Sequence, residues 1–258
     1  MAELPDLSVF AKTLNHYFKG HPLKEVEVTV AKKLNVTVDE LRKKLEGKKL
    51  ELVQREGKTL EFHFSGGNIL GLHLMLRGEL TLLGKENPSP KYEILRFDFG
   101  RHGSFAVTDI LKQAKPTLNP APVKAPDALS IGREDFLKML FKKTTPIKTL
   151  LMDQKQIRGI GNSYADELLW EARISPFSSA KAIPEKQAIR LYDLMKQVLE
   201  EAIETIAELN GNELRGELRD VMKIHGANIE KSPTGKPIKS EKLNGRTAYY
   251  TDEQKLFN

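Results

Sequence analysis

Residues 147–176, IKTLLMDQKQIRGIGNSYADELLWEARISP, decide the fold of the second half of this 258-residue chain. Apolar residues recur at helical spacing on both sides of the sequence RGIGN (158–162), which predicts two helices joined by a tight turn. Asn162 is expected to cap the second helix. Gly159 and Gly161 carry no side chain, so a phosphate could approach the backbone N–H groups at the positive end of that helix. A plain turn between two helices, with no ligand, has the same pattern.

Helical periodicity continues on both sides of this segment. Apolar spacing predicts helices near residues 133–142, 146–157, 162–172 and 184–209. From residue 225 onward apolar residues become sparse, and glycines mark turns in a basic tail that we interpret as a β-hairpin. We therefore expect a helical domain over residues 128–224 and a hairpin finger over residues 225–258.

The first half of the chain has the shorter period of β-strands. Runs of β-prone residues between turn residues predict strands at 49–54, 59–64, 69–76, 79–83, 92–99 and 104–107, typical of an antiparallel sandwich or barrel. Apolar residues at helical spacing from Leu7 to Phe18 predict an opening helix that ends at Gly20. Four of the 13 prolines fall in residues 111–127 and predict a linker. The expected fold class is α+β, with an N-terminal β-sandwich domain (1–110).

Composition limits the class of protein. With 40% hydrophobic and 29% charged residues, the chain is expected to fold as an ordinary globular protein. The absence of cysteine excludes disulfides, thiolate zinc sites and cysteine nucleophiles, and favours a cytoplasmic location. A net charge of +6 favours a polyanionic partner. No stretch has the roughly 18 apolar residues of a membrane span, and the first residues lack an apolar targeting segment, so no membrane association is expected.

Five segments, taken in order, resemble the formamidopyrimidine-DNA glycosylase and endonuclease VIII family. They are AELPDL (2–7), the turn GK (57–58), the strand sequence HLML (73–76), the segment 147–176 and GRTAYY (245–250). In the family the fourth segment is the helix-two-turn-helix DNA-binding element, and the fifth lies in a β-hairpin finger. The resemblance extends over nearly the whole chain and implies a β-sandwich domain joined to a helical DNA-binding domain.

The resemblance implies a bifunctional DNA glycosylase and abasic-site lyase of base excision repair with four catalytic residues. Removal of Met1 would leave Ala2 with a free amine, whose reference pKa of about 7.7–8.0 keeps part of it neutral and able to form a Schiff base at C1′ of the damaged nucleotide. Glu3 would act as general acid–base on the sugar. Lys58 would act on the departing base or a phosphate, and Arg246 would stabilise a phosphate leaving group.

The other matching positions are expected to bind DNA. They are His73, Leu76, Lys91, Lys148, Lys155, Gly159, Gly161 and Asn162. Most would hold backbone phosphates, while Leu76 would act as an apolar wedge and the damaged base would be flipped out of the stack. Lys155 could instead point into solvent, and His73 could be a strand histidine with no ligand. The resemblance implies damaged double-stranded DNA as the partner, a monomer, and no cofactor.

Two departures from the family concern its chemistry. The N-terminal proline of the family is Ala2 here, so the nucleophile would be a primary amine. Many members hold zinc in the finger with two Cys-x-x-Cys pairs, and the matching positions are approximately Lys231, Thr234, Thr251 and Gln254. We therefore expect no bound metal and a zincless finger held by packing of Ile238, Tyr249 and Tyr250.

Two further departures concern substrate choice. The Arg-Arg-Phe-Gly segment that fills the gap left by the flipped base in the family is absent, since TD (108–109) is followed by ILKQ (110–113). Residues 210–224 leave little room for the loop that closes over 8-oxoguanine in some members. Ring-opened formamidopyrimidines, further-oxidised purines and abasic sites are expected substrates at least as much as 8-oxoguanine. The alternative hypotheses are a catalytically silent relative that binds abasic or distorted DNA and an RNA-binding module, which would explain only the middle of the chain.

Overall fold

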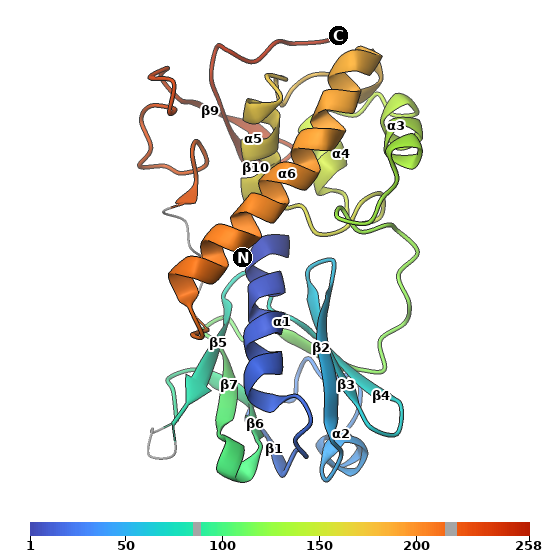
Figure 1. The fold of residues 1–258 in the computed structure, drawn as a ribbon, viewed down its shortest axis with the longest axis vertical. Coiled ribbons are helices and arrows are strands. Elements are labelled where there is room, and N and C mark those ends of the chain that lie inside the picture. Colours follow the sequence, from blue (N-terminus) through green and yellow to red (C-terminus); the bar gives the residue numbers. More distant parts are fainter. Residues whose placement is uncertain (85–88, 215–220) are drawn as a thin grey trace. The chain divides into compact units, whose positions relative to one another are not determined.

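The computed structural model describes residues 1–84, 89–214 and 221–258. The chain divides into two compact units, one formed by Met1–Val123 with Ile206–Leu218 and the other by Lys124–Thr205 with Arg219–Asn258. The first unit contains most of the strands and the second most of the helices (Figure 1). The finer domain boundaries expected from the sequence stay a prediction.

The first unit is an antiparallel β-sandwich that begins with a helix, as the sequence predicts. Its two four-stranded sheets have the orders β1-β6-β7-β5 and β2-β3-β4-β8, with all neighbouring strands antiparallel. The elements are α1 (Leu4–Phe18), β1 (Glu25–Val28), α2 (Val38–Leu45), β2 (Leu50–Glu56), β3 (Thr59–Phe64), β4 (Asn68–His73), β5 (Gly78–Leu83), β6 (Glu93–Asp98), η1 (Gly100–His102), β7 (Ser104–Asp109) and β8 (Lys115–Leu118).

Strand β3 shows why these sequences form a sandwich. Leu60, Phe62 and Phe64 are buried, whereas the residues between them are only partly buried. Because successive side chains point to opposite faces of a strand, one face of β3 is apolar. That face is stabilised when it is covered by the second sheet and by α1.

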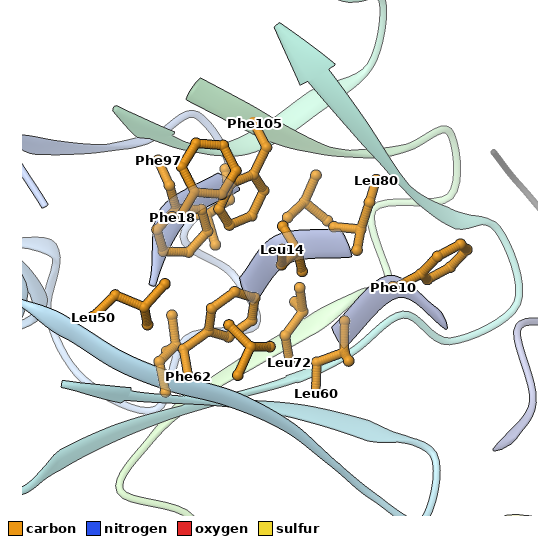
Figure 2. Packing of buried hydrophobic residues seen from close by; sticks show 14 of the residues in the cluster. Phe10, Leu14, Phe18, Leu50, Leu60, Phe62, Leu72, Leu80, Phe97 and Phe105 are labelled. Carbon is orange, nitrogen blue, oxygen red and sulfur yellow. The ribbon is translucent and has the colours of Figure 1, made fainter. Parts of the chain in front are cut away.

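Aromatic rings from both sheets and from α1 meet in the core of this unit (Figure 2). Phe62 of β3 stacks on Phe97 of β6 and on Phe105 of β7, with ring centroids 5.6 and 5.7 Å apart. Phe18, at the end of α1, has its ring centroid 5.3 Å from that of Phe105. Burial of these rings and their mutual contacts stabilise the sandwich. The core therefore fixes α1 and the residues at its N-terminus.

The sequence prediction lacks β1, α2 and β8. β1 has the sequence EVEV, and α2 buries only Leu41 and Leu45, so both carry few apolar residues from which a pattern can be recognised. β8 lies within the proline-rich stretch expected to be a linker, with Pro116 opposite Leu72 of β4. Proline is tolerated at this position because β8 is an edge strand and needs no N–H for a second neighbour.

The second unit contains helices and a terminal β-hairpin, as the sequence predicts. Its elements are α3 (Arg133–Phe141), α4 (Ile147–Met152), α5 (Asn162–Glu171), η2 (Ala180–Ala182), α6 (Glu185–Asn210, of which residues up to Thr205 belong to this unit), β9 (Lys239–Leu243) and β10 (Arg246–Tyr250). Within the described ranges, no helix combines the length and the apolar character needed to cross a membrane.

One side chain locks the connection between α4 and α5. The Nε2 of Gln154 donates to the carbonyl oxygens of Met152 at 3.0 Å and Ile160 at 2.8 Å. Its Oε1 accepts the N–H of Gly159 at 3.0 Å. These bonds hold a turn where the sequence predicts more helix, so α4 ends at Met152 and not near residue 157. Gly159 has a φ of +103°, which a residue with a side chain rarely adopts.

Candidate active site and nucleic-acid interface

The start of α1 positions the residues expected to carry the covalent chemistry. Ala2 and Glu3 are buried, and the helix begins at Leu4. Glu3 is the N-cap residue and forms a capping box with Asp6, in which the backbone N–H of Glu3 donates to Oδ2 of Asp6 at 2.9 Å. This arrangement fixes the backbone next to the nitrogen of Ala2.

The β2–β3 turn places Lys58 in the same unit. Gly57 has a φ of +60°, which favours glycine in this turn, and Lys58 follows it as a buried residue. Arg55 ties the turn to α1, because its Nη1 donates to the carbonyl oxygen of Gly57 at 3.1 Å and its Nε donates to Oγ of Ser8 at 2.9 Å. The turn that carries Lys58 is therefore anchored to the first half of α1.

His73 ends β4 and is held in one tautomer. Its Nδ1 accepts the N–H of Met75 at 3.0 Å, so the proton of the neutral ring lies on Nε2. Burial, followed by the positive charges of Lys58 and Lys115, lowers the pKa of His73. At neutral pH His73 therefore offers a neutral Nε2–H donor, which suits a phosphate oxygen.

Leu76 is one of three exposed apolar residues on two turns at the same end of a sheet. Leu76 precedes β5, and Ile110 and Leu111 follow β7; in the ladder between these strands Gly78 pairs with Asp109. Leu76, Ile110 and Leu111 are 54%, 54% and 50% exposed. The buried Asp109 shapes the second turn, since its Oδ1 accepts the N–H of Leu111 at 2.8 Å. We call Leu76, Ile110 and Leu111 the apolar turn cluster.

Two of the predicted phosphate ligands are lysines on the surface of their units. Lys91 is exposed, and its Nζ lies 4.9 Å from the ring centroid of Tyr92 in a cation–π contact. Lys155 is exposed in the turn after α4. Gly159 and Gly161 in the same turn are buried. Both lysines are accessible to a phosphate, and their roles stay a prediction.

Lys148 and Asn162 point to the hairpin. The Lys148 side chain is 1% exposed, its Nζ lies 2.8 Å from Oδ1 of Asp166, and it donates to the carbonyl oxygen of Thr247 at 2.8 Å. The Nδ2 of Asn162 donates to the same carbonyl oxygen at 3.2 Å. The prediction that Asn162 caps α5 is wrong, because the N-cap is Gly161. The ammonium group of Lys148 is used inside the protein, which argues against a direct phosphate contact.

Arg246 opens β10 directly after a tight turn. Asn244 and Gly245 have φ values of +48° and +78°, as a two-residue hairpin turn of type I′ requires. The Nδ2 of Asn244 donates to Oγ1 of Thr149 in α4 at 3.0 Å. Arg246 is exposed and lines a surface pocket together with residues of α4 and of the turn. The second unit thus brings Lys148, Asn162 and Arg246 into one neighbourhood.

Glu253 is the centre of a polar network in the finger. It accepts hydrogen bonds from Oγ1 of Thr234 at 2.8 Å and Oγ1 of Thr251 at 3.1 Å. The indole N–H of Trp170 donates to it at 3.3 Å, and Nη1 of Arg173 lies 3.2 Å away. Burial alone would raise the pKa of Glu253, but these bonds and the Arg173 charge lower it. The finger is therefore joined to the end of α5 by hydrogen bonds.

The positions expected to replace the zinc ligands are largely part of this network. Thr234 and Thr251 belong to it, and the buried Gln254 donates from Nε2 to the carbonyl oxygen of Ile174 at 2.9 Å. Lys231, the fourth position, is exposed, and the neighbouring Ser232 is buried with its Oγ 2.8 Å from Oγ1 of Thr234. In the part of the chain that the structure describes, no group of three histidine, aspartate or glutamate side chains could hold a metal ion.

Ring contacts contribute to the finger as the sequence predicts. Tyr249 packs edge-on against His225 with centroids 5.0 Å apart, and Tyr250 packs edge-on against Phe177 at 5.2 Å. Ile238 is partly buried. Ring packing alone therefore does not account for how the finger is held together. The hydrogen bonds of Glu253, which the sequence did not predict, also contribute.

Sequence reasoning missed several charged residues that are buried or partly buried in the two units. Asp6, Asp166, Glu167, His225 and the partly buried Glu253 were not candidates. The run YADELLW (164–170) in α5 does carry a usable signal, because two acids stand among apolar residues at positions that are expected to be buried, and all seven residues are buried in the structure. Asp6 and Glu253 have no such signal, since their partners come together only in the folded chain.

Comparisons with known proteins agree with this architecture. Residues 1–115 match the family model "Formamidopyrimidine-DNA glycosylase N-terminal domain", and residues 124–211 match "Formamidopyrimidine-DNA glycosylase H2TH domain". A formamidopyrimidine-DNA glycosylase of Carboxydothermus hydrogenoformans is 30% identical over 88% of this chain and 89% of its own. One from Listeria monocytogenes serotype 4b is 29% identical over 97% of this chain and 98% of its own.

A solved structure has the same fold over nearly the whole length. The Lactococcus lactis Fpg in complex with DNA containing an abasic site superimposes with a TM-score of 0.88 at 25% identity, covering 98% of this chain and 100% of that one. A β-sandwich followed by a helix-two-turn-helix unit and a hairpin finger defines a class of DNA-repair glycosylases. This chain belongs to the formamidopyrimidine-DNA glycosylase family, DNA glycosylases of base excision repair with abasic-site lyase activity.

Proposed function

We propose that this protein removes oxidised or ring-opened bases from double-stranded DNA and then cleaves the strand, as a cytoplasmic monomer without a cofactor. The observation that carries the proposal is the Ala2-Glu3 pair, buried directly before α1 in a chain of this family. The Lactococcus lactis relative is described with DNA containing an abasic site, Fapy-dG or an oxidised pyrimidine. These lesions are the substrate class that we propose here.

The first unit carries the covalent steps of the proposal. After loss of Met1, the amine of Ala2 attacks C1′, the bond between C1′ and the damaged base breaks, and opening of the sugar ring gives a Schiff base. Glu3 protonates the ring oxygen as it leaves C1′ and thereby favours the open form. Lys58 stabilises the departing base or a nearby phosphate. Loss of a proton from C2′ then expels the 3′ phosphate and cleaves the strand.

The DNA contacts come from both units in this proposal. His73 donates its Nε2–H to a phosphate, and Lys91 and Lys155 supply positive charge from exposed positions. Asn162 donates the second N–H of its Nδ2 group to a phosphate near the lesion, and Gly159 and Gly161, which lack side chains, let the strand approach the turn. Arg246 stabilises the phosphate that leaves in the final elimination. Because charged contacts dominate, affinity falls steeply with salt, and a flat salt response would contradict this assignment.

Borohydride trapping tests the nucleophile. A labelled duplex with one abasic site is incubated with borohydride and with wild-type protein, Ala2→Ser or Ala2→Gln. Serine at position 2 permits removal of Met1, whereas the larger glutamine retains it, and intact mass confirms both. We expect a covalent band with the wild type and Ala2→Ser and none with Ala2→Gln.

The same experiment separates the enzyme from the alternative, a catalytically silent DNA-binding relative. The departures that favour the alternative are Ala2 in place of proline and the absence of the arginine and phenylalanine that fill the duplex gap in the family. A wild-type protein that lacks Met1, binds abasic DNA in a gel shift and gives no trapped band would overturn the enzymatic proposal. A band that persists in Ala2→Gln would refute only the choice of nucleophile.

A further inference from the structure

Three titratable side chains are buried together in the second unit. The Nζ of Lys148 lies 2.8 Å from Oδ1 of Asp166, and Nδ1 of His225 lies 2.7 Å from Oδ2 of the same carboxylate. The Asp166 side chain is fully buried and that of Lys148 nearly so. Moving such charges out of water is costly and is offset only by close partners, so the cluster has little value as a source of stability. The cluster instead holds these three side chains and the backbone groups bonded to them in one arrangement.

The cluster converges on strand β10. Lys148 donates from Nζ to the carbonyl oxygen of Thr247 at 2.8 Å, and Asn162 donates to the same oxygen at 3.2 Å. The backbone N–H of Tyr249 donates to Oδ2 of Asp166 at 3.1 Å. Thr247 and Tyr249, two residues apart on the strand, are thus both held by groups from α4 and α5.

The neighbouring acid, Glu167, holds the segment that leads into the finger. Its carboxylate accepts the backbone N–H groups of Lys223 at 3.0 Å, Ile224 at 2.9 Å and His225 at 2.8 Å. Burial raises the pKa of Glu167, and the three backbone bonds oppose that rise. Glu167 therefore places His225 where its ring meets Asp166.

Arg246 lies between two anchors to α4. On one side, Asn244 in the hairpin turn is bonded to Thr149 at 3.0 Å. On the other side, the carbonyl oxygen of Thr247 is bonded to Lys148. With the backbone fixed before and after it, Arg246 keeps only the freedom of its side-chain rotamers. A guanidinium that must meet a developing phosphate charge benefits from such preorganisation.

We propose that Asp166 is a positioning residue for Arg246. Its carboxylate directs the ammonium group of Lys148 to the Thr247 carbonyl and receives the Tyr249 N–H, which sets the start of β10. Lys148 then acts through the strand and not by touching a phosphate. This inference rests on the proposed function, in which Arg246 meets a phosphate of the damaged strand.

A double-mutant cycle tests the inference. Affinity for a duplex with a tetrahydrofuran abasic analogue is measured for wild type, Asp166→Asn, Arg246→Ala and the double variant. We expect Asp166→Asn to weaken binding roughly 10-fold alone and less than about 2-fold when Arg246 is already alanine, because interacting residues are not additive. Equal weakening in both backgrounds would mean that Asp166 supports the fold in general and would overturn the proposal.

A second variant covers the case in which Asp166→Asn leaves Lys148 as an uncompensated buried charge and does not fold. The pair Lys148→Met with Asp166→Asn removes both buried charges, and the amide oxygen of asparagine can still accept the N–H of Tyr249. We expect this pair to unfold near the wild-type temperature and to lose the same Arg246-dependent affinity. Wild-type affinity in the folded pair would refute the proposal.

Two further measurements separate this inference from the proposed function. Asp193→Asn, an exposed aspartate paired with Arg133 on the same unit, is the matched control and should bind as the wild type does. Borohydride trapping by the wild type reports the nucleophile alone. If borohydride traps the wild type on DNA but the effects of Asp166→Asn and Arg246→Ala on affinity are additive, only the role of Asp166 is refuted. If the wild type gives no trapped band, the enzymatic function is refuted.

Discussion

The backbone N–H of Glu3 donates a 2.9 Å hydrogen bond to Oδ2 of Asp6, and both residues are buried at the start of α1. Burial raises the pKa of Asp6 to about 6; the bond from Glu3 opposes this rise and the charge of Glu3 adds to it. The folded protein therefore binds the proton of Asp6 more tightly than the unfolded chain does. A carboxylate next to the proposed active site is thus held at a cost in stability.

Asp6→Asn should stabilise the protein at neutral pH. Between pH 3.8 and about 6 the folded state keeps a proton that the unfolded chain has lost, so the contribution of Asp6 to stability falls as the pH rises through this window. Above it the cost is at most about 3 kcal/mol, since one pKa unit corresponds to roughly 1.4 kcal/mol. Asparagine keeps an oxygen for the Glu3 N–H. Urea unfolding at pH 7.5 and pH 4 should show a gain only at the higher pH.

Asp39 provides the matched control for that experiment. It lies in the first turn of α2 as Asp6 does in α1, but it is exposed. Asp39→Asn should lower the free energy of unfolding by a few tenths of a kcal/mol, because it removes a negative charge from the positive end of the helix dipole. This change is opposite in sign to that expected for Asp6→Asn. If Asp6→Asn also lowers the free energy of unfolding at pH 7.5, the ionised carboxylate stabilises the fold and the argument from burial fails.

Glu3→Gln should separate base removal from DNA binding. Glutamine keeps an oxygen that can serve the cap of α1 but cannot transfer a proton to the sugar. We expect excision of a formamidopyrimidine base to fall by 100-fold or more, in the range of general acid–base contributions, with affinity for the tetrahydrofuran duplex within about 2-fold of wild type. Parallel loss of both properties, or a lower melting temperature, would identify Glu3 as a structural residue.

Glu253→Gln should destabilise the finger, because its charge is bound by three hydrogen-bond donors and by Arg173. We expect a melting temperature lower by several degrees. The pKa of Glu253 is lowered in the folded state, so its stabilisation is complete above the ordinary value of 4.5 and is lost as the pH falls below it. The deficit of the variant should therefore shrink toward pH 3. The exposed Glu230 of the same finger is the control, and an equal effect of Glu230→Gln would rule out a specific network.

Chelation should leave the finger intact. Thr234, Thr251 and Gln254 match zinc-ligand positions only through the resemblance to the family, and their hydroxyl and amide side chains are weak ligands for zinc. Treatment with EDTA, followed by a gel filtration step, should change neither the melting temperature nor abasic-site cleavage. Loss of activity that zinc restores would contradict the zincless interpretation.

The sequence was sufficient for features that depend on local periodicity. The alternation in β3 and the apolar spacing of α1 and α6 each reflect one face that must be covered, and the structure places these elements as predicted. α2 and β8 escaped prediction because their burial depends on neighbours distant in sequence, such as β4 for Pro116. The low strand propensity of proline favours a linker at Pro116. A proline is compatible with a strand there only because β8 is an edge strand.

Candidate site residues could be predicted from the sequence where they belong to a recognisable motif. They could not be predicted where a role depends on contacts between residues that are distant in the sequence. Ala2, Glu3, Lys58 and Arg246 follow from sequence motifs. The burial of Lys148 does not, because it depends on Asp166 one helix away and on Thr247 at the far end of the chain. A lysine in a DNA-binding motif is naturally assigned to a phosphate, and only the fold shows that its charge is already paired.

Of the three residues of the apolar turn cluster, the sequence predicted only Leu76 as a DNA contact. The sequence after Asp109 lacks the arginine and phenylalanine that fill the duplex gap in the family, yet Ile110 and Leu111 are exposed at the same end of the sheet as Leu76. Large apolar side chains that insert between bases are a known way to hold an opened duplex. Aliphatic groups have no donors or acceptors with which to distinguish the opposite base.

Leu111→Ala should therefore weaken binding to abasic DNA without changing preference for the opposite base. Covering half of a leucine side chain with bases is worth about 1 kcal/mol, so we expect roughly a 5-fold loss of affinity. Wild-type cleavage of duplexes with each of the four bases opposite the abasic site should vary by less than about 3-fold. Val123→Ala, at an exposed valine elsewhere in the chain, is the control. Strong preference for one opposite base, or unchanged affinity of Leu111→Ala, would show that the cluster does not enter the duplex.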